Sequence, residues 1–187
     1  WEKRGGCPQK SCLVPERCAN LNIPFGVQVR LLKEVLSLPK VKHVFIESGL
    51  RYDILMGEEG KAYLEYIMRK HVSGQLKVAP EHTSNRVLRL MNKPDFEVYE
   101  NFVRVFKEVR KKIKREIYLV NYFISSHPGS EIEDEIDLFL YLFKNRIRPK
   151  QIQDFLPVPM TLSSCLYYTG IHPFTREKVY VPRIFKE

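Results

Sequence analysis

The chain has 187 residues and a net charge of +9, with 44% hydrophobic and 28% charged residues. This length suits one ordinary domain, and the composition is typical of a folded globular protein rather than a disordered one. No apolar run approaches the roughly 20 residues of a membrane-spanning helix, so we expect no membrane partner. Four cysteines do not indicate a disulfide scaffold and favour the cytoplasm. The chain begins at Trp1 rather than Met, which favours a segment of a longer protein.

Helix-like and strand-like segments alternate along the chain. Apolar residues at helical spacing predict helices over residues 29–36, 62–70 and 83–91, and a longer helix that Asp95 caps. A further helix begins at a capping box formed by Ser130 and Glu133. Its expected buried stripe consists of Ile132, Ile136, Phe139, Leu140 and Phe143. Strands are expected at residues 43–47, 75–79, 117–124 and 151–156.

Four strand–helix repeats predict an α/β fold with a parallel sheet of βα units joined by right-handed crossovers. Both a doubly wound sheet and part of a (β/α) barrel fit this pattern. No glycine-rich Gly-x-Gly-x-x-Gly or Walker loop follows any strand, which weakens the nucleotide-binding folds. We expect a cysteine-containing segment at 1–25, a core at 26–160, and a truncated C-terminal extension at 161–187.

A dense basic cluster lies within residues 104–115, in the expected long helix. Such a cluster can bind nucleic acid. However, apolar residues recur at helical spacing through the same segment, so its charges also suit the solvated face and last turn of an amphipathic helix. The solvated face is the favoured interpretation.

Polar residues gather where the expected strands end. In parallel α/β folds, chemistry takes place at these carboxyl ends. The four ends are residues 47–53, 79–83, 125–129 and 155–160. Arg51 and Asp53 can pair with each other or contact a substrate. His82 and His127 can act as acid–base groups or ligands, although a histidine beside a helix start is more often a local hydrogen-bonding residue.

Several long blocks in these regions resemble the YgiQ-type radical SAM proteins, and the resemblance covers essentially the whole chain. The blocks are His71-Val-Ser-Gly-Gln-Leu-Lys-Val-Ala-Pro-Glu-His-Thr83, Asn92-Lys93-Pro94, Tyr122-Phe-Ile-Ser-Ser-His-Pro-Gly129, Pro157-Val-Pro-Met160 and Tyr167-Tyr-Thr-Gly170. By this resemblance, the strands are the distal four of a partial (β/α)6 barrel.

The resemblance implies an enzyme that reductively cleaves S-adenosylmethionine to a 5′-deoxyadenosyl radical, which acts on an unknown substrate. The cofactors would be S-adenosylmethionine and a [4Fe–4S] cluster, and the electron donor a flavodoxin or ferredoxin. The family's Cys-x-x-x-Cys-x-x-Cys loop is absent from these residues. The cluster ligands are therefore expected outside this chain, which alone would be inactive.

The resemblance also assigns cofactor-binding residues. Lys93 would pair with the methionine carboxylate, although an exposed helix-end lysine is the alternative. Glu81 would accept hydrogen bonds from ribose hydroxyls or contact the sulfonium, unless it is a buried structural acid. Tyr122 and Ile124 would contact adenosine, as at the similar position of oxygen-independent coproporphyrinogen oxidase-like enzymes. Two further residues complete the set, Ser126 on the same strand and Leu156 in the pocket wall.

Three cysteines near the start, Cys7, Cys12 and Cys18, are spaced Cys-x4-Cys-x5-Cys. Three thiolates can bind an iron–sulfur cluster or contribute to a zinc site, but free thiols in a packed loop are the more common case. Together with the basic helix, they support an alternative function as a zinc- or nucleic-acid-binding module. Nucleic acid is thus a possible but not a favoured partner.

Overall fold

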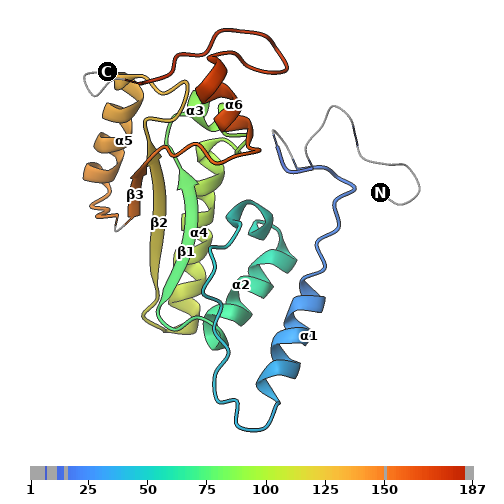
Figure 1. The fold of residues 1–187 in the computed structure, drawn as a ribbon. Helices are drawn as coiled ribbons and strands as arrows, with labels where there is room; N and C mark the ends of the chain where they lie inside the picture. The colour runs from blue at the N-terminus through green and yellow to red at the C-terminus, as the bar shows by residue number, and fades with distance from the viewer. Residues whose placement is uncertain (1–6, 8–11, 15–16, 150, 184–187) are drawn as a thin grey trace.

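The computed structural model describes residues 7, 12–14, 17–149 and 151–183 and shows a mixed α/β fold around a three-stranded parallel sheet (Figure 1). The strands are β1 (Gln75–Glu81), β2 (Tyr118–Ser125) and β3 (Gln151–Asp154), in that spatial order. The helices are α1 (Phe25–Leu36), the 3-10 turn η1 (Tyr52–Leu55), α2 (Glu58–Lys70), α3 (Asn85–Leu90), α4 (Phe96–Ile113), α5 (Ile132–Lys144) and α6 (Leu162–Thr169). None of these described helices has the length and apolar character needed to cross a membrane.

The helices cover one face of the sheet. Leu76 and Val78 of β1 are buried in a core with α2 and α4, whereas Lys77 and Ala79 lie on the opposite, partly exposed face. Figure 1 shows α4 behind β1 and β2, with no described helix in front of them. The sheet therefore has a packed face and an open face, and all three strands point their carboxyl ends to the same edge.

The predicted strand at residues 43–47 is wrong. Residues 43–47 form no β-bridge, and the chain pairs with β1 only beyond this segment, in an isolated parallel bridge between Leu50 and Val78. The Ile46 N–H donates to the carbonyl of His71 at the end of α2, 2.9 Å away, because β1 begins only at Gln75. The segment thus lacks the repeated ladder hydrogen bonds that define a strand. The described chain contains three strands rather than four.

The long helix α4 follows the predicted amphipathic pattern, but Asp95 at its N-cap makes no side-chain cap hydrogen bond and accepts from Arg89 instead. Its buried residues are Phe96, Tyr99, Phe102, Val105, Phe106, Val109 and Ile113. Tyr99 also donates a hydrogen bond to Asn121 Oδ1 of β2 over 2.9 Å, which satisfies two buried polar groups. These contacts join α4 to the sheet, and α2 packs on its other side.

The buried stripe predicted for α5 is wrong. Only Leu138 and Leu142 are buried against Phe123 of β2, whereas all five predicted residues are exposed, from Leu140 at 40% to Phe143 at 74%. Arg86 of α3 forms ion pairs with Glu131 and Asp134. These ion pairs hold the side of α5 opposite the predicted stripe against the core.

The predicted capping box is also displaced by one residue. Glu131 and Asp134 form it rather than Ser130 and Glu133, because the Ser130 hydroxyl donates to Glu135 instead. The division into segments 1–25, 26–160 and 161–187 stays a prediction. Of the first segment, the structure describes residues 7, 12–14 and 17–25, and of the last it describes residues 161–183.

Candidate functional site

The carboxyl ends of β1 and β2 both finish in a strained backbone conformation. Glu81 has φ +69° and Ser126, directly after β2, has φ +57°. Non-glycine residues rarely adopt the left-handed region, and such strain is concentrated at functional sites. Both residues belong to the predicted cofactor-binding set, but Ser126 lies in the turn beyond the strand rather than on β2 itself.

Glu81 and Lys93 form an ion pair at this edge. Lys93 follows α3, and its Nζ donates to Glu81 Oε1 over 2.9 Å. The side chains are 12% and 31% exposed respectively. Glu81 Oε2 is buried and has no hydrogen-bond partner among the described residues. A buried carboxylate oxygen without a donor is costly, so this atom is a ready acceptor for an external hydroxyl or amine.

A small cavity of about 190 Å³ lies beside Lys93 and Ala79. Arg51 and Asp53 line it, and Arg51 Nε donates to both Asp53 oxygens over 3.0 and 3.1 Å. The predicted pairing of these two residues is thus confirmed. Ligand pockets usually enclose roughly 300–1,000 Å³. This cavity is smaller than that range.

The open face of the sheet continues from this edge along β2. Phe123 and Asn121 are buried on the helix side, so Tyr122 and Ile124 lie on the open face, partly exposed. The Tyr122 hydroxyl donates to Gln153 Oε1 of β3. Leu156, just after β3, is 64% exposed. Tyr122 and Ile124 therefore share the uncovered face of β2, and their contact with adenosine stays a prediction.

Glu135 of α5 organises the turn after β2, and sequence reasoning missed it. Glu135 Oε1 accepts hydrogen bonds from the backbone N–H of Ser126, over 2.9 Å, and from the Ser130 hydroxyl. The buried His82 Nε2 lies 3.6 Å from the same oxygen. Burial opposes ionisation, but these donors outweigh it and lower the pKa of Glu135. The sequence signal that could have identified Glu135 is its position as an acidic residue in the first turn of the helix after a strand.

The two histidines at the strand ends make local contacts. His82 Nδ1 accepts from the Ser84 N–H over 3.0 Å, and His127 bonds to the Pro128 carbonyl and the Ser163 hydroxyl, each over 2.8 Å. Burial lowers the pKa of His127 to about 4, so its ring is neutral near pH 7. Each ring thus makes a hydrogen bond close in the sequence, as the local interpretation predicts, but His127 also bonds to α6, and His82 Nε2 has no hydrogen-bond partner among the described residues.

The turn that follows His127 depends on a glycine. Gly129 has φ +89°, and a Cβ there would lie 2.1 Å from Leu90 Cδ1. Its N–H donates to the Tyr180 carbonyl over 2.7 Å, which ties the C-terminal segment to this edge. A side chain at this position would strain the backbone and require the Leu90 side chain to move.

The described residues contain no group of three or more His, Cys, Asp or Glu side chains placed to bind a metal ion. Cys7 and Cys12 are exposed and Cys18 is half-buried, and the Cys18 N–H donates to the Cys12 carbonyl over 2.9 Å. The structure therefore lends no support to the predicted metal site at these cysteines.

No family model and no solved structure matches this chain. It is 47% identical over 186 residues to a UPF0313 protein of Clostridium botulinum, a match that covers 100% of this chain and 29% of that protein. UPF0313 proteins of Methanocella arvoryzae and Methanosarcina acetivorans are 48% and 46% identical, with 30% and 25% of their lengths covered. The chain spans less than a third of these curated relatives. It is therefore similar, from end to end, to one portion of the UPF0313 proteins.

Proposed function

We propose that this chain is the S-adenosylmethionine-binding portion of a radical SAM enzyme. Two independent features support the proposal. The blocks at residues 71–83, 92–94 and 122–129 resemble YgiQ-type radical SAM proteins. The observation that carries the proposal is the Glu81–Lys93 pair at the carboxyl end of β1, beside the open sheet face, with Glu81 Oε2 buried and unsatisfied.

The residues at this edge fit S-adenosylmethionine chemically. The ribose carries hydroxyl donors, and Glu81 Oε2 lacks a donor among the described residues. Lys93 has three N–H donors and uses one on Glu81, so two remain for the methionine carboxylate. The same pair can therefore bind the ribose and the methionine carboxylate of the cofactor. Glu81 Oε1 meanwhile keeps the Lys93 ammonium group oriented.

The open face supplies the adenosine contacts in this proposal. Tyr122 and Ile124 offer apolar surface on the uncovered side of β2, and Leu156 adds exposed apolar surface next to it. When bound, S-adenosylmethionine and a [4Fe–4S] cluster supply the 5′-deoxyadenosyl radical. The role of these residues is to bind and orient the cofactor and to exclude water, while the cluster ligands lie on another part of the polypeptide.

We further propose that the parallel sheet is part of a (β/α)6 barrel whose remaining strands come from the rest of the protein. Its one-sided helix layer and shared carboxyl edge support this architecture. Reduction by a flavodoxin or ferredoxin also belongs to the proposal.

The test uses the full-length protein, purified without oxygen, reconstituted with iron and sulfide, and treated with dithionite and S-adenosylmethionine. We expect 5′-deoxyadenosine, detected by chromatography. Lys93→Ala should lower its yield about tenfold to a hundredfold, because a hydrogen bond to a charged group contributes about 1.5–3 kcal/mol. Lys42→Ala, at an exposed lysine without a described partner, is the matched control and should leave the yield unchanged.

Two results would contradict the proposal. One is the absence of 5′-deoxyadenosine in a sample with a fully loaded cluster. The other is an equal yield from Lys93→Ala and the unmodified protein at limiting S-adenosylmethionine.

A further inference from the structure

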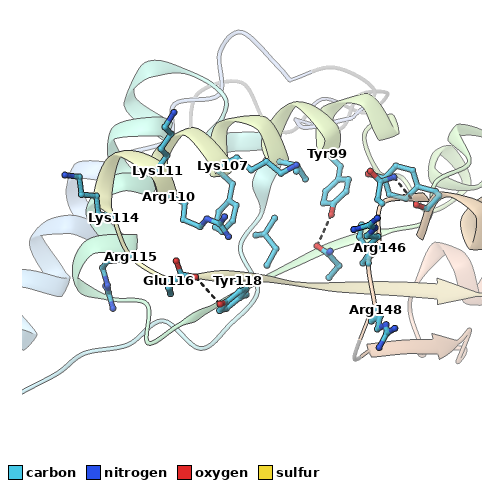
Figure 2. Close-up of a pocket in the computed structure, with 17 residues that line it drawn as sticks. Tyr99, Lys107, Arg110, Lys111, Lys114, Arg115, Glu116, Tyr118, Arg146 and Arg148 are labelled. Carbon is cyan, nitrogen blue, oxygen red and sulfur yellow. Dashed lines mark hydrogen bonds between the residues drawn. The ribbon is translucent and has the colours of Figure 1, made fainter. Parts of the chain in front are cut away.

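A second, larger cavity lies near the amino ends of the strands, away from Glu81. Its volume is about 840 Å³, within the usual range for organic ligands. Figure 2 shows it between α4 and β2, with the segment after α5 at one end. Tyr118 and Leu119 of β2 line it near the start of the strand. This cavity therefore shares no lining residue with the small one beside Lys93.

The cavity is surrounded by positive charge that the described chain does not neutralise. Arg115, also in the lining, donates to the backbone carbonyls of Met68, Arg69 and Val72. The only acid in the lining is Glu116, which accepts from the Tyr118 hydroxyl over 3.0 Å. Six other basic side chains have no ion pair and no side-chain hydrogen bond within the described residues, namely Lys107, Arg110, Lys111, Lys114, Arg146 and Arg148.

These cations converge from two separate parts of the chain. Figure 2 shows Arg110 reaching from α4 toward β2, whereas Lys111 and Lys114 extend outward at the rim. Arg146 and Arg148 approach from the segment after α5. Elsewhere on α4, Lys112 pairs with Glu65 of α2 over 2.6 Å. The absence of acid partners is thus a property of the face around this cavity.

Part of the cavity lining is apolar and aromatic. Val103 and Phe106 of α4, Leu119 of β2 and Ile147 after α5 contribute to it. Tyr118, which is 58% exposed, presents a ring beside Arg110. A free inorganic anion would leave this apolar surface in water, whereas an anion with a flat body would cover it.

We propose that this cavity binds a small phosphorylated ligand of the nucleotide class, in which a sugar joins an aromatic base to two or more phosphates. Arginine guanidinium groups bind phosphate through paired N–H donors, so Arg110 and Arg146 would hold the phosphates. The aromatic base would lie on the apolar part of the lining, against Tyr118. This site is independent of the proposed S-adenosylmethionine site.

The test is calorimetric titration of the full-length protein with ADP, pyrophosphate and adenosine. We expect ADP to bind with one-to-one stoichiometry and at least tenfold more tightly than either fragment, since each fragment uses only half of the site. Arg110→Gln and Arg146→Gln should each weaken ADP binding about tenfold. Lys112→Gln removes the same charge from the opposite side of α4 and should have no effect, as should Lys93→Ala.

Several outcomes would overturn the proposal. They are the absence of ADP binding at millimolar concentration, pyrophosphate binding as tight as ADP binding, and equal losses from Arg110→Gln and Lys112→Gln. A 20-nucleotide oligouridylate that binds the cavity more tightly than ADP would assign it to nucleic acid instead. Unchanged unfolding midpoints of the variants without ligand confirm that each variant is folded.

Discussion

The two ends of the sheet differ in whether their charged side chains have partners within the chain. At the carboxyl end, buried and half-buried charges have partners within the chain, as in the pairs Glu81–Lys93 and Arg86–Asp134. Near the amino end, cations such as Arg110 and Arg146 surround a cavity with no acid partner among the described residues. Charges at the first end are therefore balanced mainly within the protein, whereas those around the second cavity have no acid partner among the described residues.

The largest expected effect concerns the carboxyl end and its pH dependence. Burial lowers the pKa of His127 to about 4, against about 6.5 in an unfolded chain. Between these values only the unfolded state takes up the proton, so stability is present above pH 6.5 and is lost as pH falls toward 4. The loss from this residue between pH 7 and pH 4.5 should be about 2.5 kcal/mol. Urea unfolding at pH 7 and pH 4.5 measures it.

His127→Gln should flatten this pH dependence, because it removes the titrating group. His43→Gln, at an exposed histidine, should leave the dependence as it is. If the two variants retained the same slope between pH 7 and pH 4.5, a buried neutral His127 would not be its cause.

A smaller effect is expected from Glu81→Gln, which keeps the shape of the side chain and removes its charge. Lys93 would lose its counter-charge at a site where it is only 31% exposed. We expect a loss of about 2 kcal/mol in the free energy of unfolding. Glu47→Gln is the matched control, because Glu47 is 71% exposed and 3.9 Å from Lys77, and it should change stability by less than about 0.5 kcal/mol. Equal losses from both would remove the contrast between a buried and a surface pair.

The smallest effect is expected near the amino end. Lys111→Ala removes an exposed charge with no described partner from a cluster of like charges. Its effect on stability without ligand should stay within about 0.5 kcal/mol, with a slight gain at low salt because repulsion is then least screened. Chemical unfolding at low and high salt tests this. A loss above about 1 kcal/mol would show that Lys111 has a partner and that this end is also internally neutralised.

The contrast between α4 and α5 shows how far sequence patterns reach. The periodicity of α4 predicted its buried face because that helix packs between α2 and the sheet, where its whole stripe finds apolar neighbours. The periodicity of α5 is equally regular, but Phe139 and Phe143 have no described element to pack against. An apolar stripe shows that a helix is amphipathic, and only the neighbouring elements decide whether that stripe is buried.

At the candidate site, local sequence patterns predicted three of the four expected strands correctly, together with the polar residues at their carboxyl ends. They also placed Tyr122 and Ile124 on one face of β2, since side chains alternate along a strand. The prediction of a strand at 43–47 was wrong because its hydrogen bonds depend on where α2 ends and β1 begins, which lies outside its local sequence.

Only the tertiary structure decided which distant groups meet. These contacts join residues that lie 9 to 36 positions apart in the sequence and on different elements. They are Glu81 with Lys93, Ser126 with Glu135, and Arg110 with Arg146 at the cavity. Local sequence specifies backbone preference and amphipathic pattern, whereas strand register and helix packing set the distances between side chains. Both candidate ligand sites depend on those distances.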